Sequence, residues 1–326
     1  MQGQVIRQDR GVLEVLTAEG KVLARPSGRL RHQARDAVDL PVVGDLVELN
    51  GIAIQAVLPR KSLLVRREAG REAGGEAPQL IAANVDLALI VEPLDRPARL
   101  SRLERMVAFV RSGGVAPAVV LSKADFHPAP EDAARSVREA LAGAGELPVV
   151  VVSARTGAGM EALAPLLRSG TVVALLGASG AGKSTLVNHL LGEERLPTGP
   201  VRAFDAKGRH TTSWRELLDL PSGARIIDGP GMRELGLWAA GGDELESTFA
   251  DVETLSRACR FRDCAHQGEP GCAVQAAIDQ GDLPAERLEH LHKLRREQSR
   301  GSPERRRLER LLGRATRDVS RDKRRR

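Results

Sequence analysis

The spacing of hydrophobic positions changes twice along the chain, and these changes predict three regions: residues 1–72, 73–241 and 242–326. In the first region short apolar segments alternate with polar positions and are separated by Gly, Pro and Asp. Alternating segments joined by tight turns are typical of a small antiparallel β-barrel. Its strands are expected around Val5 and at residues 12–16, 21–23, 42–49 and 52–57. Residues 68–78, rich in Gly, Glu and Ala, predict a flexible linker or a mobile loop.

In the second region near-continuous apolar runs alternate with helical patterns. Such runs of Val, Ile and Leu are typical of strands buried on both faces, as in a parallel sheet flanked by helices. Strands are predicted at residues 85–91, 118–121, 148–152, 172–176 and 225–227. Helices are predicted at residues 100–111, 131–142, 160–167 and 184–191. This region is therefore expected to be an α/β domain, and the region after it is helical and strongly charged.

The hydrophobic content is that of a globular protein, and the apolar runs are too short for a membrane span. The chain has 326 residues, 42% of them hydrophobic, which is enough for two or three domains with cores. Its apolar runs fall far short of the roughly 18 residues that a membrane span needs. The first residues also lack the apolar core of a signal peptide. We therefore expect a cytoplasmic protein with no membrane partner.

The formal charge of +6 is concentrated near the C-terminal end. Residues 284–326 contain 16 Lys or Arg and 7 Asp or Glu, a net charge of +9, so the preceding residues carry −3. A run ending Arg-Asp-Lys-Arg-Arg-Arg is typical of an arm that neutralises nucleic-acid phosphates. A solvated helix face with a disordered tail is the alternative for this segment taken alone.

Residues 177–184, with the sequence GASGAGKS, have the pattern of a phosphate-binding loop. They lie between a predicted strand and a predicted helix, the context that such a loop requires. The glycines let backbone N–H groups point at phosphates, Lys183 reaches the β- and γ-phosphates as a catalytic charge, and the Ser184 hydroxyl binds Mg²⁺. The expected nucleotide contacts are Gly177, Ala178, Ser179, Gly180, Ala181, Gly182, Lys183, Ser184 and Thr185.

A carboxylate and two glycines follow the predicted strand at residues 225–227, in the sequence Asp-Gly-Pro-Gly. Asp228 is placed to hold Mg²⁺, usually through water, and the backbone of Gly231 can meet the γ-phosphate. The distance of this segment downstream of the phosphate loop favours that function over a simple turn.

Two shorter motifs, each at the end of a predicted strand, indicate which base is bound. The Asp125 carboxylate can accept hydrogen bonds from N1–H and the exocyclic amine of guanine, a donor pair that adenine lacks. Lys123 would lie along the base and ribose, while the turn of Ser153 and Ala154 would offer a backbone N–H to guanine O6. The motifs therefore favour GTP and GDP over ATP. The usual first residue of the Asp125 motif is Asn, so the shorter Ser122 predicts weaker guanine affinity.

Both base motifs precede the phosphate loop, although in an ordinary GTPase they follow it. Read from Gly177 forward and then back round to Ser122, the motifs fall into their usual spatial sequence. The sequence therefore predicts a circularly permuted P-loop GTPase core that binds GTP or GDP together with Mg²⁺.

A switch segment is predicted at residues 207–212, between the phosphate loop and Asp228. Either Thr211 or Thr212 can complete the Mg²⁺ shell when GTP is bound and release it after hydrolysis. Met232 stands where many small GTPases place the Gln that orients the attacking water, so unassisted turnover should be slow. His210 is the candidate within the chain for orienting that water. The alternatives are a structural role for His210 and a group supplied by a partner.

All three cysteines, Cys259, Cys264 and Cys272, fall in one short segment together with His266. Three thiolates and one imidazole are the complement of a closed, tetrahedral, structural Zn²⁺ site. Three cysteines cannot all pair as disulfides within one chain. We therefore expect one structural Zn²⁺ that folds a segment with little hydrophobic core.

These residues together resemble the ribosome small subunit-dependent GTPase A family. The resemblance rests on the permuted motif order, on GRHTT at residues 208–212, on DGPGMRE at residues 228–234 and on CRFRDCAH at residues 259–266. It extends over nearly the whole chain and implies an N-terminal OB-fold, a permuted GTPase core and a C-terminal helical zinc-binding domain. It also implies GTP hydrolysis late in maturation of the small (30S) ribosomal subunit, stimulated by that subunit, with rRNA binding and release on hydrolysis. We expect a monomer.

The amino-acid types in the predicted barrel limit the ways in which it could bind RNA. Residues 1–70 contain no Phe, Trp or Tyr, so the stacking of bases on aromatic rings that many OB-folds use is excluded there. Arginines that contact phosphates or stack as guanidinium planes would favour recognition of folded rRNA by shape. The candidates are Arg29, Arg31, Arg35, Arg60, Arg66 and Arg67.

Two other functions compete with a GTPase that times its own release. One is a GTP-dependent binding module in which hydrolysis is incidental, and Met232 is consistent with it. The other is a permuted GTPase of the large subunit, against which the N-terminal barrel and the Cys/His cluster argue.

Overall fold

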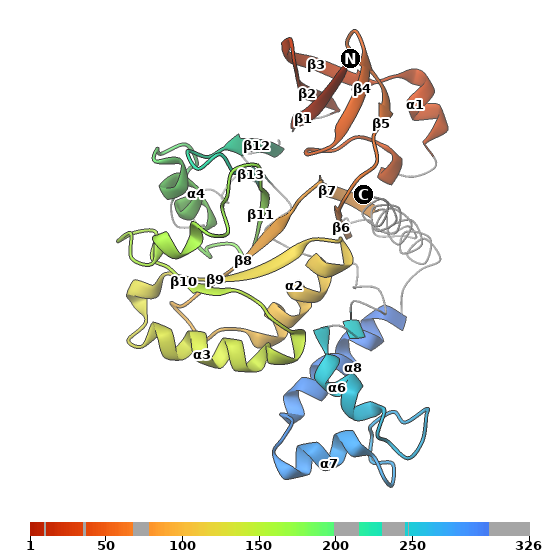
Figure 1. Ribbon diagram of the computed structural model, residues 1–326, viewed down its shortest axis with the longest axis vertical. Helices are drawn as coiled ribbons and strands as arrows, with labels where there is room; N and C mark the ends of the chain where they lie inside the picture. Colours follow the sequence, from red (N-terminus) through yellow and green to blue (C-terminus); the bar gives the residue numbers. More distant parts are fainter. Residues whose placement is uncertain are drawn as a thin grey trace, which may run out of the picture.

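The computed structural model describes residues 1–9, 11–34, 37–67, 78–198, 215–229, 245–246 and 248–299. A β-barrel, an α/β domain and a helical region follow one another along the chain (Figure 1). The barrel and the helical region lie at opposite ends of the longest axis of the molecule. The predicted fold class, all-β, then α/β, then helical, is confirmed.

The N-terminal strands close into a five-stranded barrel. β1 pairs with both β2 and β4, and β3 pairs with β5, so the row of strands returns to its start. Val5, Val15 and Ile54 are fully buried, which follows from the period-two pattern of the sequence. The strands are β1 (Gln2–Asp9), β2 (Val12–Thr17), β3 (Gly20–Pro26), β4 (Leu46–Asn50) and β5 (Ala53–Val57), with helix α1 (Gly28–Gln33) and a short 3-10 turn η1 (Ala37–Asp39) between β3 and β4.

The strand expected at residues 42–49 begins only at Leu46, because a turn precedes it. The buried Asp45 carboxylate accepts hydrogen bonds from the N–H of Val42 at 2.8 Å and from Arg60 Nε at 2.7 Å. Gly44 has a φ of +94°, and a Cβ at this position would lie 2.0 Å from the carbonyl oxygen of Ala83. The turn therefore brings the barrel into close contact with the start of the α/β domain.

Two strands flank the segment that was expected to be a linker. β6 (Leu63–Arg67) and β7 (Pro78–Ala83) pair antiparallel in a sheet of their own. The sequence pattern did not predict either strand. Most of the expected linker, residues 68–77, lies outside the described residues.

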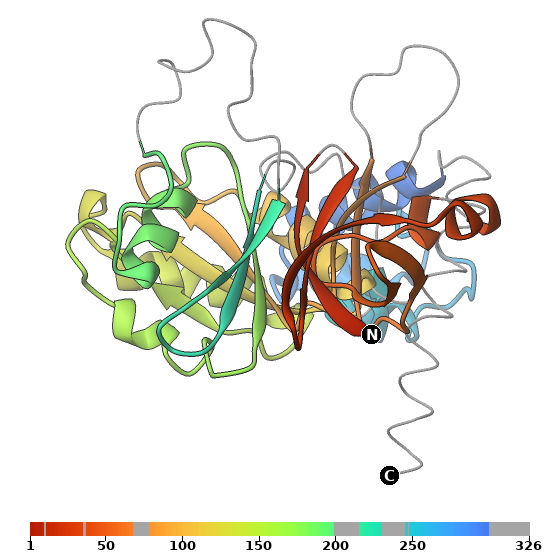
Figure 2. The same cartoon turned by 90° about the horizontal axis from the view of Figure 1, so that it is seen from above.

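The α/β domain continues the barrel's sheet. Its parallel strands stand in the order β10, β9, β8, β11, β13, and β12 runs antiparallel beside β13. β12 also pairs antiparallel with β1 of the barrel, so that one sheet of 11 strands joins both regions (Figure 2). The strands are β8 (Leu87–Pro93), β9 (Ala116–Ser122), β10 (Val149–Val151), β11 (Val172–Leu176), β12 (Arg215–Asp219) and β13 (Arg225–Asp228). The five parallel strands match the predicted ones, whereas β12 was not predicted.

Helices cover both faces of this sheet. Neighbouring residues of β8 point to opposite faces: Ile90 packs in the core beneath α2 and α3, and Leu89 packs in the core beneath α4. The helices are α2 (Leu100–Ser112), α3 (Pro130–Ala140) and α4 (Lys183–Leu191). The helix expected at residues 160–167 is wrong, because only Met160–Leu163 forms a 3-10 turn, η4, after Gly159 with a φ of +73°. A further 3-10 turn, η3 (Ala142–Ala144), follows α3.

The C-terminal described residues form three helices, α6 (Ala250–Ser256), α7 (Ala273–Gln280) and α8 (Ala285–Ser299). Phe249, Val274 and Leu291 are fully buried in their shared core, to which α2 contributes Ala108. Arg287 of α8 forms an ion pair with Glu104 of α2 at 2.8 Å. The helical region is thus packed against the α/β domain through α2. Among the described residues no helix combines the length and the apolar character that a membrane crossing needs.

Candidate nucleotide and metal sites

The sequence motifs meet at one edge of the α/β sheet. The phosphate loop follows β11, Asp228 ends β13, Ser122 ends β9, and Ser153 comes shortly after β10. These four strands are parallel, so their carboxyl ends share an edge of the sheet. Ligands of open α/β sheets bind at this edge.

The phosphate loop has a backbone that only glycine suits at its bends. Gly177 has a φ of +151°, and a Cβ at this position would lie 2.4 Å from the carbonyl oxygen of Val91 in β8. Gly182, with a φ of +83°, is the cap from which α4 begins. The loop therefore turns directly into a helix N-terminus, whose N–H groups favour an anion.

Lys183 is largely buried at the first position of α4. Its Nζ donates hydrogen bonds to the carbonyl oxygens of Gly177 and Ala178, each at 2.7 Å. The ammonium group is thus held inside the phosphate loop by the loop's own carbonyl oxygens.

Ser122 connects the base motif to the phosphate loop. Its hydroxyl donates a hydrogen bond to the carbonyl oxygen of Ala181 at 2.7 Å, and both residues are buried. The shorter side chain therefore still makes the tie for which Asn is the usual residue. This contact gives no structural reason for a loosened base loop.

The residues of the two predicted base motifs form a hydrogen-bonded group at the ends of β9 and β10. Ser153 Oγ donates to Asp125 Oδ1 at 2.6 Å, and Arg155 Nε donates to Asp125 Oδ2 at 2.8 Å. Lys123 adopts a left-handed backbone with a φ of +58° and pairs through Nζ with Asp95 Oδ2 at 2.5 Å. Partial desolvation acts to raise the pKa of Asp125, but the hydrogen bonds from Ser153 and Arg155 outweigh it and lower the pKa below its usual value. The carboxylate is therefore ionised near neutral pH.

Sequence reasoning missed two members of this group, Arg155 and Asp95. Arg155 directly follows the Ser153-Ala154 pair, and that position was the available signal. Asp95 lies in the loop between β8 and α2, and no spacing rule connects it with Lys123.

Several expected site residues fall outside the described part of the chain. They are His210, Thr211, Thr212, Gly231 and Met232. Ser184 and Thr185 stand in the first turn of α4, and Asp228 ends the strand next to β11. The structure thus brings the phosphate loop, Asp228 and both base motifs to one edge.

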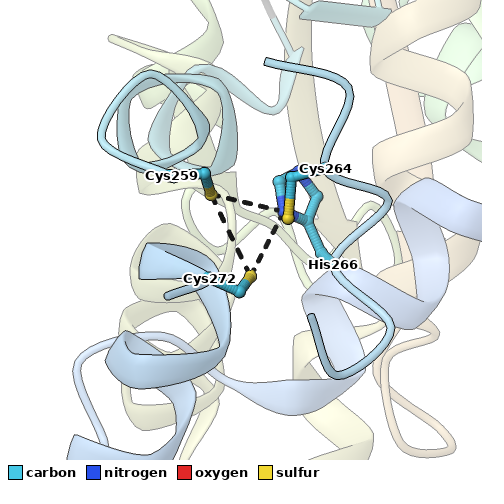
Figure 3. Close-up of side chains that lie close together, drawn as sticks. All are labelled: Cys259, Cys264, His266 and Cys272. Atoms are coloured by element: carbon cyan, nitrogen blue, oxygen red, sulfur yellow. Dashed lines mark hydrogen bonds between the residues drawn. The ribbon is translucent and has the colours of Figure 1, made fainter. Parts of the chain in front are cut away.

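The four Cys and His side chains converge in the helical region, as Figure 3 shows. Their ligand atoms all lie within 4.8 Å of one another. Cys272 Sγ is 3.4 Å from His266 Nδ1 and 4.0 Å from Cys259 Sγ. A tetrahedral Zn²⁺ site with bonds of about 2.3 Å to sulfur needs S–S separations of roughly 3.8 Å. The cluster therefore fits a four-coordinate zinc site.

The chain folds tightly around this cluster. His266 has a left-handed backbone with a φ of +60°, and the Glu269 carboxylate accepts from the N–H groups of Ala265 at 2.9 Å and Gln267 at 2.7 Å. Cys272 caps α7, and its Sγ accepts from the N–H of Gln275 at 3.3 Å. A thiolate at a helix N-terminus is stabilised by the helix dipole.

Proton affinities in the cluster are consistent with metal binding. Desolvation, together with the neighbouring Arg295 and His292, lowers the pKa of His266 below its usual value, so the imidazole is neutral and able to coordinate at pH 7. Desolvation and the neighbouring thiols Cys272 and Cys259 raise the pKa of Cys264 to about 11. A cation is therefore needed for Cys264 to be a thiolate near neutral pH.

One arginine expected to contact RNA is committed to the fold. The side chain of Arg60 is only 10% exposed, and besides Asp45 it donates to the carbonyl oxygen of Leu40 at 2.8 Å. The expectation for Arg60 is therefore wrong, because its guanidinium neutralises a buried carboxylate. Arg29 and Arg31 of α1 are exposed, so contact with RNA stays a prediction for them. Arg35 and the side chains of Arg66 and Arg67 lie outside the described residues.

The order of the motifs along the chain now has a structural counterpart. The base motifs follow β9 and β10, which precede the phosphate-loop strand β11 in sequence although all three belong to one parallel sheet. Fold and motif order together define a circularly permuted P-loop GTPase with an N-terminal barrel and a C-terminal helical domain.

Comparison with known proteins narrows this class to one family. The sequence model of the RsgA GTPase family matches residues 57–238. The small ribosomal subunit biogenesis GTPase RsgA of Opitutus terrae is 44% identical over 332 residues, which cover 98% of this chain and 88% of that protein. The protein of the same name from Xylella fastidiosa strain 9a5c is 48% identical over 297 residues, covering 90% of this chain and 84% of its own. The chain belongs to the RsgA GTPase family.

Solved structures agree with this assignment. YjeQ from Thermotoga maritima superposes with a TM-score of 0.65 at 27% identity and covers 92% of this chain and 99% of its own. YloQ, described as a circularly permuted GTPase, superposes with a TM-score of 0.61 at 23% identity, covering 93% of this chain and 96% of its own. The second similarity concerns the fold alone.

Proposed function

We propose that this chain hydrolyses GTP in the cytoplasm during late maturation of the small (30S) ribosomal subunit. Relatives that align over most of the chain are named for that process. The observation that carries the proposal is the hydrogen bond from Ser122 to Ala181, because it joins a guanine-reading loop to a phosphate-binding loop. In this proposal the subunit stimulates hydrolysis, and hydrolysis releases the protein.

Each motif has a proposed role in the nucleotide site. Asp125 reads N1–H and the exocyclic amine of guanine, Lys123 lies along the base, and the turn of Ser153 and Ala154 donates to O6. The backbone of residues 177–185 surrounds the phosphates, and Lys183 neutralises charge on the β- and γ-phosphates. These roles agree with the described positions of the same residues at one sheet edge.

Mg²⁺ would be held by the Ser184 hydroxyl and, through water, by Asp228. Ser184 lies in α4, which follows β11, and Asp228 ends the neighbouring strand β13. Their oxygen atoms suit this hard cation. When bound, the ion would neutralise negative charge that develops on the phosphates during hydrolysis. We propose that Thr211 or Thr212 completes its shell and that the Gly231 N–H contacts the γ-phosphate.

We propose His210 as the group of this chain that orients the attacking water, since Met232 cannot. A His210→Ala variant is then expected to bind GTP normally but to lose stimulated turnover. If the variant turns over at the wild-type rate with small subunits present, the water is oriented by another group.

Cys259, Cys264, His266 and Cys272 would hold one structural Zn²⁺. All four ligand positions are filled by protein groups, so the metal supplies folding free energy to the helical region. The exposed Arg29 and Arg31 of α1 and the basic residues 284–326 would contact rRNA, mainly at phosphates. We propose that the protein acts as a monomer.

The decisive experiment measures GTP turnover with small subunits, with large subunits and with neither, and uses ATP as the control. Stimulation by the small subunit alone supports the proposal. Stimulation by large subunits would instead indicate a factor of the other subunit. Nucleotide-dependent binding to small subunits without stimulated turnover would indicate a GTP-dependent binding module.

Base reading has its own test in an Asp125→Asn variant. An amide cannot accept both guanine donors as a carboxylate does, so guanine nucleotide affinity should fall sharply, by about 100-fold if a charged hydrogen bond and one further bond are lost. Titration with a fluorescent guanine nucleotide measures the change. Equal affinity in the variant and the wild type would remove the assignment of Asp125.

A further inference from the structure

The carboxylate that would read guanine is already engaged on both oxygens. Oδ1 of Asp125 accepts one hydrogen bond, from Ser153 Oγ at 2.6 Å. Oδ2 accepts two hydrogen bonds from Arg155, one from Nε at 2.8 Å and one from Nη2. The guanidinium therefore occupies one of the two oxygens with which this carboxylate would accept hydrogen bonds from a base.

Asp125 has too few free acceptor sites to bind both donors of guanine while Arg155 is in place. A carboxylate oxygen accepts about two hydrogen bonds, so Oδ1 has room for one donor of guanine whereas Oδ2 has none while Arg155 is in place. Guanine presents N1–H and an exocyclic amine N–H side by side, and each needs its own oxygen. Arg155 must leave Oδ2 before both guanine donors can bind.

The structure also provides a second partner for Arg155. Its guanidinium carbon lies 5.1 Å from the centroid of the Phe126 ring, within the range of a cation–π contact. Phe126 is 61% exposed, and the Arg155 side chain is 67% exposed. The guanidinium can therefore keep its contact with the Phe126 ring when it leaves the carboxylate, and it remains exposed to solvent.

We propose that Arg155 is a specificity-determining residue that binds the guanine-reading oxygen Oδ2 of Asp125 and is displaced from it by the exocyclic amine of guanine. The inference rests on the proposed function, because it requires Asp125 to read the base. Hypoxanthine has N1–H but no exocyclic amine, so it needs one oxygen only and leaves Arg155 in place. Arg155 thus weakens binding of guanine nucleotides and has no effect on hypoxanthine nucleotides.

The test compares the affinities of the full-length wild type and an Arg155→Ala variant for GDP and IDP, measured by competition against a fluorescent guanine nucleotide. Because the ion pair is exposed, its removal should tighten GDP binding by about two- to fivefold. IDP affinity should not change. An Arg168→Ala variant is the matched control, since this exposed arginine precedes β11 at the opposite edge of the sheet. An Arg155→Lys variant, with no planar fork, should tighten GDP binding by less than Arg155→Ala.

The outcomes separate the inference from the proposed function. Tighter GDP binding with unchanged IDP binding supports the displacement. Unchanged or weaker GDP binding, or equal tightening for GDP and IDP, overturns it while Asp125→Asn still loses guanine affinity. If Asp125→Asn binds GDP as tightly as the wild type, base reading by Asp125 fails and the inference fails with it.

Discussion

The barrel and the C-terminal helices are both attached to the GTPase core, but by different kinds of contact. The barrel shares backbone hydrogen bonds with the core through β1 and β12, and through the N–H of Ala83 and the carbonyl oxygen of Val43 at 3.0 Å. Its buried side chains belong to the same hydrophobic core as those beneath α2 and α3. The helical region has a second hydrophobic core, to which α2 contributes Ala108.

The helical region is instead joined to the core by a buried ionic group. Arg287 of α8, 5% exposed at its side chain, pairs with Glu104 of α2 and with Asp251 of α6 and donates to the carbonyl oxygen of Thr248 at 2.9 Å. His290 Nδ1 lies 2.5 Å from the second oxygen of Glu104. Burial acts to raise the pKa of Glu104, and the charges of His290 and Arg287 oppose that shift.

This difference has a consequence for stability. A shared hydrophobic core and the pairing of β1 with β12 make the barrel and the GTPase domain one cooperative unit. A core built mainly from its own side chains, a metal site and a small contact area that includes Ala108 and the Arg287 ionic group allow the helical region to open by itself. Three changes test this comparison, and the largest effect is expected for metal removal.

Removal of the metal should unfold the helical region and leave the barrel intact. A structural Zn²⁺ contributes on the order of 10 kcal/mol in small domains, so a chelator or a Cys272→Ser variant should abolish hydrogen-exchange protection in α6 and α7. Protection of β1, β2 and β11 should not change. Loss of protection in the barrel on chelation would show that the two regions are not independent.

The next largest effect is expected for Arg287→Met. The variant leaves the buried Glu104 with only His290 as an ionic partner and removes Arg287 from Asp251, which should destabilise the attachment by about 3–5 kcal/mol. Chemical denaturation together with hydrogen exchange of α8 measures it. Combining the variant with Glu104→Gln should recover part of the loss, because the buried charge is then removed. Arg295→Met is the control: Arg295 pairs with Glu253 and is 41% exposed, so about 0–1 kcal/mol is expected.

The third change uses one substitution in both cores. Leu64 and Leu291 are each fully buried, Leu64 in the core shared with the barrel and Leu291 in the core of the helical region. Changing either to Ala should destabilise by about 2–5 kcal/mol. Leu64→Ala should lower the unfolding midpoint of the barrel and the GTPase domain together, whereas Leu291→Ala should affect the helices alone. Equal loss of protection everywhere in both variants would contradict the comparison.

The parallel strands were the most predictable part of the fold. β11 spans the predicted residues because a strand buried on both faces has a continuous apolar sequence, VVALL. The phosphate loop and the Cys/His cluster were predictable for a related reason: their chemistry requires particular residue types at short, fixed spacings.

Contacts between distant residues were not predictable in the same way. β12 has the sequence RELLD, which follows no single pattern, and its pairing with β1 joins Arg7 to Glu216 across most of the chain. Arg60 is of a residue type that often contacts RNA, and only the folded structure shows that it pairs with the buried Asp45. The contact of Arg155 with Asp125 was likewise not predictable, because the two residues are 30 positions apart in the sequence.

The pairing of β1 with β12 also determines how the sheet ends. A strand that presents unpaired N–H and C=O groups can pair with a strand of another molecule. Arg7 and Gln8 cover the outer side of β12 at Glu216 and Arg215, and closure of the barrel leaves β1 to β5 without an edge of their own. The other end of the row is β10, which is only three residues long. A chain shortened to begin after the barrel would uncover β12 and is expected to self-associate.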